Sequence, residues 1–283
     1  MNSGVAMEEA EYKWKRFDTQ RQAYEKKFAK VFREELNRQT RAIIRMATAE
    51  RVGRWMSGIR EDDLKFDDAA VMKIIEDLTI KVGMNYAKEI WDDVRGKKKE
   101  MKVNLPSEPI LIIDDDDKIV DYWISYLRRY ARVEGAERVT SIGLSQRKQA
   151  IRLIKGVIEK AVEKGWGAEV IAESIQKELN GVMIPLNTYR AMRIARTEVL
   201  MAATLGSVTG ARSLDVPMLK TWLATPYGNY RPDHLALHKV TIDMDDKFDV
   251  GGVLMDRPGD PEGGAENVCN CRCAISFKPK KIV

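Results

Sequence analysis

Apolar side chains recur at steps of three and four residues through the first part of the chain. They are Phe17, Tyr24, Phe28, Val31, Phe32, Leu36, Ile43 and Ala47. Neither glycine nor proline interrupts this pattern between Gly4 and Gly53, and the other positions are rich in Lys, Arg, Glu and Gln. The spacing predicts one long amphipathic helix, or two nearly continuous ones, which either packs lengthwise on other helices or extends toward a partner.

The same spacing predicts a second helix. It begins at Asp67-Asp68, where carboxylates suit a helix N-terminus, and it ends at Gly96 and the lysines at 97–99. The four aspartates at 114–117 lack the alternating ligand spacing and the turn glycine of a calcium loop. They are therefore interpreted as the cap of a third helix, which starts near Lys118, with a cation site as the alternative.

Three shorter helices are predicted in the middle of the chain. Ser145 can cap the first, which reaches a turn at 165–167. The second ends at Asn180-Gly181, and Asn187 caps the third, which runs to about Leu205.

Three arginines lie at three-residue steps on the last of these helices. Arg190, Arg193 and Arg196 could bind phosphates or acidic residues of a partner. The alternative is pairing within the chain, for instance with Glu198.

After Gly210 the pattern changes to short β-like pieces separated by loops rich in glycine and proline. The sequence therefore predicts an α+β protein with long N-terminal helices and a small α+β C-terminal module of short strands and long loops. The predicted segments are a helical N-terminal region at 1–140, a helical lead-in at 141–205 and the C-terminal module at 206–283.

Composition fits a soluble globular protein, because 32% of the 283 residues are charged and 44% are hydrophobic. No apolar run approaches a membrane span, and the first residues lack a signal-peptide core, so we expect synthesis and first action in a cytoplasm. The net charge is +5. Residues from Ala202 onward are neutral, so the excess lies before them, which is typical of a solvated helical surface and only weakly indicates nucleic acid.

All three cysteines lie within five residues, at Cys269, Cys271 and Cys273, and the only histidines are His234 and His238. On a strand the three thiols would share one face, with neighbours about 7 Å apart, too far for a disulfide. Together with one imidazole they could supply a tetrahedral zinc site. The alternative is that the cysteines are packed as small hydrophobic residues and that the histidines are hydrogen-bonded orienting groups.

The histidine spacing does not indicate hydrolysis. His234 and His238 would share a helix face, but Leu235 stands where the His-Glu-x-x-His motif places its general base. We therefore expect no enzymatic activity.

A set of short motifs in a fixed order resembles the C-terminal domain of the phage Mu F-like minor head proteins. The motifs are Ile194-Ala195-Arg196-Thr197-Glu198, Lys220-x-Trp222-x-Ala224, Arg231-x-x-His234, Phe248, Pro258-Gly259-Asp260 and Asn270-Cys271-Arg272-Cys273. The resemblance covers about residues 145–277. It departs at His238, where the family has a small residue, and at Cys269, where it has an aliphatic one.

The resemblance implies a structural minor head protein of a tailed bacteriophage, present inside the head near the portal vertex and acting in head morphogenesis. The implied partners are the portal protein, the inner surface of the major capsid protein and, nonspecifically, DNA. Two alternatives stay open: a zinc-stapled, non-enzymatic DNA-binding protein, and a metal-dependent enzyme that acts on nucleic acid through His234, His238 and the cysteines. Within the module, Asp260 is expected to turn a loop or to hold Arg272, which would point away from the thiols.

Overall fold

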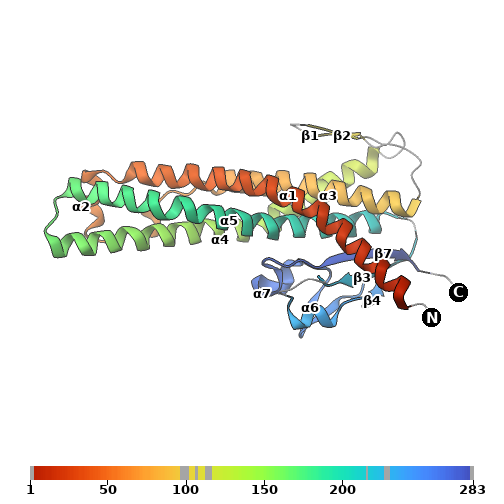
Figure 1. Cartoon of the computed structure of the whole chain (residues 1–283). Helices are drawn as coiled ribbons and strands as arrows, with labels where there is room; N and C mark the ends of the chain where they lie inside the picture. The colour runs from red at the N-terminus through yellow and green to blue at the C-terminus, as the bar shows by residue number, and fades with distance from the viewer. Residues whose placement is uncertain are drawn as a thin grey trace. The chain divides into compact units, whose positions relative to one another are not determined.

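Four long helices and several short strands account for most of the chain in the computed structural model (Figure 1). The structure describes residues 3–95, 102–105, 108–111, 117–214, 216–225 and 230–280. The long helices are α1 (Ser3–Met46), α3 (Asp68–Arg95), α4 (Asp117–Lys164) and α5 (Ala168–Arg212), and shorter ones are α2 (Ala49–Trp55) and η1 (Glu61–Asp63). Long helices followed by a module of short antiparallel strands confirm the predicted α+β class.

The chain forms two compact units, each assembled from separated stretches of sequence. Unit 1 comprises Met1–Lys27, Ile75–Val133 and Ala195–Val283, and unit 2 comprises Phe28–Ile74 and Glu134–Ile194. Each of the four long helices contributes residues to both units. The predicted segments 1–140, 141–205 and 206–283 are consecutive stretches, whereas both units take pieces from several long helices.

The first two predicted helices are confirmed. Helix α1 is continuous and packs within the protein, with Phe32, Leu36 and Ile43 buried. The carboxylate of Asp67 accepts a hydrogen bond from the backbone N–H of Ala70 at 3.0 Å, which caps α3 as predicted. The predicted end of this helix at 96–99 and the aspartates at 114–116 lie outside the described residues. No helix in the described ranges is both long and apolar enough to cross a bilayer.

The predicted boundaries inside the next two helices are wrong. Helix α4 continues past Ser145, and α5 continues past Asn180-Gly181, Pro185 and Asn187, so only the predicted turn at 165–167 separates helices here. Pro185 removes the backbone donor that would bond to the carbonyl of Gly181. Tertiary packing outweighs this loss, because the inward face of α5 buries one residue on each turn around the proline, at Met183, Asn187 and Ala191.

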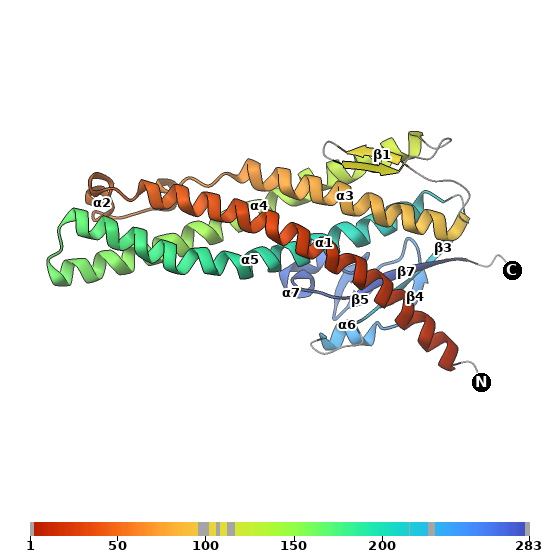
Figure 2. The ribbon, with the colours of Figure 1, turned by 45° about the horizontal axis from the view of Figure 1, so that its top comes forward.

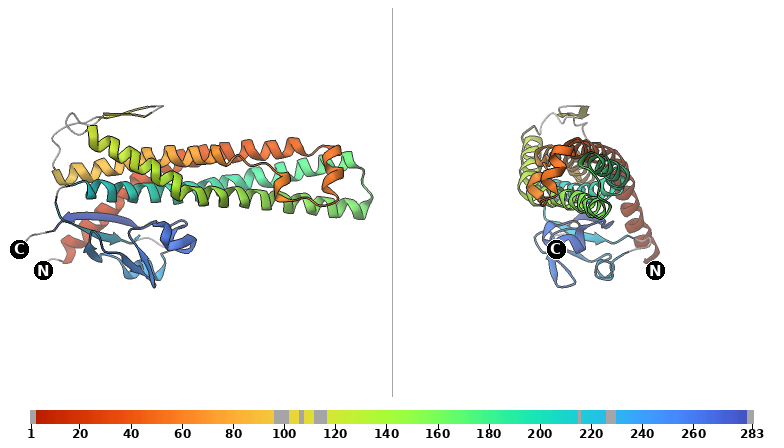
Figure 3. Two further views of the ribbon diagram at one scale, coloured as in Figure 1. Left: turned by 180° about the vertical axis from the view of Figure 1, so that it is seen from behind. Right: turned by 90° about the vertical axis from the view of Figure 1, so that its left-hand side faces the viewer.

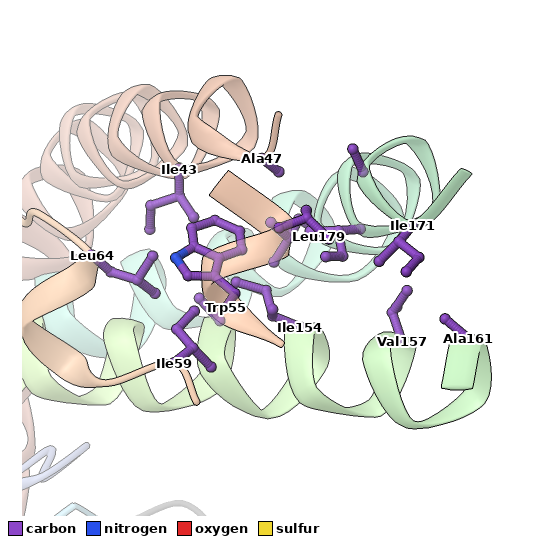
Figure 4. Packing of buried hydrophobic residues seen from close by; sticks show 14 of the residues in the cluster. Ile43, Ala47, Trp55, Ile59, Leu64, Ile154, Val157, Ala161, Ile171 and Leu179 are labelled. Carbon is purple, nitrogen blue, oxygen red and sulfur yellow. The ribbon is translucent and has the colours of Figure 1, made fainter. Parts of the chain in front are cut away.

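Unit 2 has its own hydrophobic core between stretches of α1, α2, α4 and α5. In Figure 3 these helical stretches run alongside one another, with α2 at the end where α4 turns into α5. The side chain of Trp55, on α2, lies among Ile43 of α1, Ile154 of α4 and Leu64, which follows η1 (Figure 4). Leu179 of α5 belongs to the same cluster. The short helix α2 therefore contributes a tryptophan that packs between the long helices.

The strands of unit 1 form two small antiparallel sheets in the C-terminal module. Strand β3 (Met218–Leu223) pairs with both β4 (Thr241–Asp243) and β7 (Ala274–Pro279), and β5 (Phe248–Val250) pairs with β6 (Val253–Met255). The helical pieces among them are α6 (Pro232–Ala236), η2 (Pro261–Gly263) and α7 (Gly264–Val268). A separate hairpin joins β1 (Lys102–Leu105) and β2 (Glu108–Leu111). In Figures 1 and 2 the first part of α1 passes beside β3 and β7.

Two glycines of α5 allow close packing on α3 within unit 1. A Cβ atom added at Gly206 would lie 2.0 Å from the carbonyl oxygen of Gly83, and one added at Gly210 would lie 2.3 Å from that of Ala87. The obstructing atoms are backbone, so a side chain here would force the two helices apart.

We expect Gly206→Ala to lower the free energy of unfolding by about 2 kcal/mol or more, because overpacking a rigid contact is destabilising. The control is Gly156→Ala on α4, where nothing lies within 4 Å of the added Cβ atom. That change should raise stability by about 0.5 to 1 kcal/mol through the better helix propensity of alanine. Urea unfolding of both variants measures the difference, and equal effects would contradict the close contact.

Candidate metal centre

The C-terminal module brings one histidine and two cysteines together in its interior. His234 lies on α6, a five-residue helix that starts at Pro232. Cys271 and Cys273 lie in the loop 269–273 between α7 and β7, which we call the Cys loop. The three side chains are buried, and their potential ligand atoms all lie within 4.8 Å of one another. These residues therefore form a group that could hold a metal ion.

The distances in this group suit tetrahedral coordination. The Nδ1 atom of His234 lies 3.5 Å from the sulfur of Cys271 and 3.4 Å from that of Cys273. With zinc bonds of about 2.3 Å to sulfur and about 2.0 Å to nitrogen, ligand atoms at tetrahedral angles lie about 3.5 Å apart. The two nitrogen–sulfur distances therefore fit a tetrahedral zinc site.

The imidazole of His234 is oriented by a second residue. Its Nε2 atom lies 3.2 Å from Oδ1 of Asn267, whose own Nδ2 donates to the carbonyl oxygen of Gly263 at 3.1 Å. Because the amide nitrogen is engaged in that way, Oδ1 accepts the proton of Nε2. In the neutral imidazole the lone pair therefore lies on Nδ1, which faces the sulfurs, as in metal sites with a supporting outer shell.

The hydrogen bond between the two thiols shifts their pKa values in opposite directions. A hydrogen bond from Cys273 lowers the pKa of Cys271 well below its usual value, and His234 lowers it further against the effect of burial. The same pairing, together with burial, raises the pKa of Cys273. The backbone N–H of Cys273 also points to the sulfur of Cys271 at 3.5 Å. The group therefore stabilises one thiolate, which is the form that binds metals.

Trp222 closes the site from the sheet. Its ring stands edge-on to the imidazole of His234, with centroids 5.4 Å apart, and it also contacts Phe248 at 5.2 Å. The buried indole N–H has no hydrogen-bond partner within the described part of the chain. It is close enough to Cys273 to lower the pKa of that thiol, although the larger effects of Cys271 and of burial raise it. A thiolate or metal-bound sulfur at Cys273 would give this donor an acceptor.

The Cys loop differs from the predicted strand. Cys269 and Asn270 form a turn after α7, Asn270 has a left-handed φ of 56°, and β7 begins only at Ala274. The turn separates Cys269 from the other two thiols. The carbonyl oxygen of Cys269 accepts a hydrogen bond from the guanidinium of Arg231 at 2.8 Å. His238 also lies outside the group. Within the described residues, no fourth His, Cys, Asp or Glu joins the three.

Arg272, between the two buried cysteines, binds the N-terminal helix. Its guanidinium donates to both carboxylate oxygens of Asp18 at 3.0 and 3.1 Å, and it lies 3.9 Å from Glu25. Arg21 pairs with the same two carboxylates from within α1. We call Asp18, Arg21, Glu25 and Arg272 the buried ion cluster. The indole N–H of Trp14 adds a hydrogen bond to the carbonyl oxygen of Arg272 at 3.0 Å.

Asp260 shapes a loop, as predicted, but it does not hold Arg272. Its carboxylate accepts hydrogen bonds from the backbone N–H groups of Asp256 at 2.6 Å and Glu262 at 3.2 Å, which fixes the start of η2. Arg272 points to α1 instead, because the cluster there offers two buried carboxylates.

The other predicted residues lie on α5 and on the turn. Arg196 lies 3.7 Å from Glu25, and Arg190 donates to the side-chain oxygen of Gln146 at 2.6 Å, so both make contacts within the chain. Arg193 follows Arg190 by one turn, and Glu198 is buried. The backbone N–H of Asn270 faces the hydroxyl of Thr197 at 3.4 Å.

Sequence reasoning missed Asn267 and the acidic partners on α1. Asp18, Arg21 and Glu25 recur at three- and four-residue steps between Phe17 and Phe28, on the helix face that is buried. Charged residues at buried spacing are a signal for a paired cluster. Nothing near Asn267 marks it as the residue that orients His234.

One region of the chain matches a known protein family. Residues 152–276 match the family model described as Phage Mu protein F like protein. The match starts in α4, includes α5 and ends in β7, so it contains His234 and the Cys loop. Searches of curated proteins and of solved structures found no match.

We expect Arg272→Met to lower the free energy of unfolding by about 1 to 3 kcal/mol, because it removes the half-buried partner of the buried Asp18 carboxylate, while Arg21 still compensates part of that charge. Pairing it with Asp18→Asn in a double-mutant cycle should give a coupling of at least about 1 kcal/mol. The control is Arg54→Met, which breaks an exposed pair with Glu50 and should cost under about 0.5 kcal/mol. Denaturant unfolding measures each value, and additive effects at Arg272 and Asp18 would disprove the coupling.

Proposed function

We propose that the chain is a structural minor head protein of a tailed bacteriophage, because residues 152–276 match the family described as Phage Mu protein F like protein, a family of phage head morphogenesis. In this proposal it acts near the portal vertex, inside the head, and binds the portal protein and the inner surface of the capsid. Packaged DNA is a further, nonspecific partner. The observation that carries the proposal is the family match.

The chemistry of the C-terminal module supports a structural and not an enzymatic role. His234 is 1% exposed and Cys273 is 2% exposed, so a macromolecular substrate has no access to either side chain in this conformation. Arg272 is engaged with α1. The reactive groups of the module therefore hold the fold together, as expected of a protein that presents surfaces to partners.

Head incorporation tests the function. The chain, co-expressed with the portal and major capsid proteins of its own phage, should co-purify with the assembled heads or with the portal. A chain with Arg272→Met and Asp18→Asn, which loosens the docking of α1, should be incorporated less well. Complete absence of the wild-type chain from purified heads and from portal pull-downs would refute the proposal.

We also propose that His234, Cys271 and Cys273 bind zinc as a structural ion. The N–S spacing, the orientation of His234 by Asn267 and the mixed nitrogen and sulfur donors support zinc. These three donors leave one position of the tetrahedron for a further donor. The zinc would fix the Cys loop, and with it Arg272, on the module.

The two histidines give a matched test of the zinc site. Wild-type protein purified in reducing, chelator-free buffer should contain about one zinc per chain, measured by inductively coupled plasma mass spectrometry. The His234→Ala variant should lose this zinc, whereas the His238→Ala variant should keep it. Asn267→Ala should weaken zinc binding about 10- to 100-fold. Co(II) should give a thiolate charge-transfer band that disappears in Cys271→Ser and remains in Cys269→Ser. Zinc-free wild-type protein, or equal loss in both histidine variants, would exclude the assignment.

A further inference from the structure

The net positive charge of the chain belongs to one of its two compact units. Unit 2 contains 20 Lys and Arg against 15 Asp and Glu, whereas unit 1 contains 28 of each. The whole excess of five positive charges therefore belongs to unit 2. The metal centre and the buried ion cluster both lie in unit 1, so this charge serves neither of them.

Part of the charge of unit 2 surrounds a groove of about 420 Å³, which we call the anion groove. Its lining residues are Ser141, Leu144, Ser145, Lys148, Gln149 and Arg152 of α4 and Arg190 of α5. Three of these side chains are cations, and none of the lining residues is acidic. Lys148 and Arg152 also border a neighbouring groove of about 710 Å³, which adds Arg60 and Lys155 but includes Glu61 and Glu159.

Arg190 is held in place by neutral groups only. Its Nη1 donates to Oε1 of Gln146, and Nε2 of the same glutamine donates to Asn187 at 2.8 Å. Asn187 is itself fixed by Asn37 and Thr40 on α1, at 3.0 Å each. A chain of buried amides therefore sets the position of the guanidinium. Among the described residues, no carboxylate forms an ion pair with Arg190.

The surroundings of Arg190 disfavour its positive charge. Arg190 is half-buried, and burial lowers its pKa, which the nearby charges of Arg193 and Arg152 lower further. A cation in such surroundings is normally compensated by an acidic side chain. Here the neighbouring charges are of the same sign. An anion in the groove would supply the missing compensation.

The spacing of the cations suits a row of phosphates. Lys148 and Arg152 of the anion groove and Lys155 of the neighbouring groove follow one another at steps of four and three residues, so they share a face of α4 over about 10 Å. One strand of DNA carries a phosphate about every 3.4 Å along the duplex axis, so this length faces about three phosphates. The hydroxyls of Ser141 and Ser145 add neutral donors of the kind that contact phosphate oxygens.

We propose that the anion groove binds the phosphate backbone of double-stranded DNA without reading its sequence. The inference rests on the proposed function, which places the chain beside packaged duplex DNA. The lining contains no aromatic side chain on which unpaired bases could stack, and this favours the duplex over single strands. Binding through the backbone alone is sequence-independent and weakens steeply with salt.

Two variants with the same loss of charge test the groove. The groove variant is Lys148→Gln, Arg152→Gln and Arg190→Gln, and the control is Lys30→Gln, Lys160→Gln and Lys177→Gln, all exposed lysines of unit 2 outside both grooves. Fluorescence anisotropy with a labelled DNA duplex, over a range of salt, should show more than tenfold weaker binding for the groove variant. The slope of the logarithm of its binding constant against the logarithm of the salt concentration should be shallower by roughly 2 to 3. The affinity of the control should stay within about threefold of the wild-type affinity.

Equal losses in the groove variant and the control would overturn the proposal, because the binding would then follow net charge alone. Binding to polyglutamate but not to the duplex would overturn it too. Circular dichroism checks that the groove variant is folded. A double variant with only Lys148→Gln and Arg152→Gln changes two exposed side chains, and it should still weaken binding several-fold.

Head incorporation separates the two proposals. A wild-type chain that enters heads but does not bind the duplex refutes only the groove, and one that binds the duplex but never enters heads refutes only the head function.

Discussion

The guanidinium of Arg272 and the carboxylates of Asp18 and Glu25 join parts of the chain about 250 residues apart. Charges removed from water are tolerated only when they are paired, so the docking of α1 and the position of the Cys loop have to be satisfied together. Arg272 is flanked by the two buried cysteines, which means that the same backbone segment serves the ion cluster on one side and the metal centre on the other. The geometry of His234 and its two sulfurs therefore depends on a contact made by the first helix.

In the candidate metal centre, the histidine and the cysteines are held in place by different kinds of contact. Asn267 and Gly263 orient the imidazole, and Trp222 covers it, so the histidine is held by contacts within the protein. The cysteine side depends on a short loop with a left-handed turn at Asn270, where the hydrogen bond between the two sulfurs lowers the pKa of Cys271. A bound ion would thus add most of its stabilisation to the Cys loop, the segment that also carries Arg272.

Regular periodicity predicted the long helices well, because burial of α1 and α3 depends on one amphipathic stripe that is visible in the sequence. The breaks predicted at Ser145, Gly181 and Asn187 failed since these are local signals, and packing of α4 and α5 outweighs them. The clustering of three cysteines downstream of the two histidines predicted a possible site of thiols and one imidazole, with plain packing of the cysteines as the alternative. The strand that was expected to place all three thiols on one face is replaced by a turn at Asn270, which separates Cys269 from the other two. Asp18 is 254 residues from Arg272 in the sequence and Asn267 is 33 residues from His234, so no local pattern pairs either residue with its partner.

The discontinuous make-up of the two units has a consequence for synthesis. All of unit 2 lies before residue 195, so its core around Trp55 can close while the last third of the chain is still being translated. Unit 1 contains both ends of the chain and cannot be completed until residue 272 has emerged. Until then Asp18, Arg21 and Glu25 remain on a helix whose final partner does not yet exist. Unit 2, which carries the net positive charge, can therefore fold before unit 1 is complete.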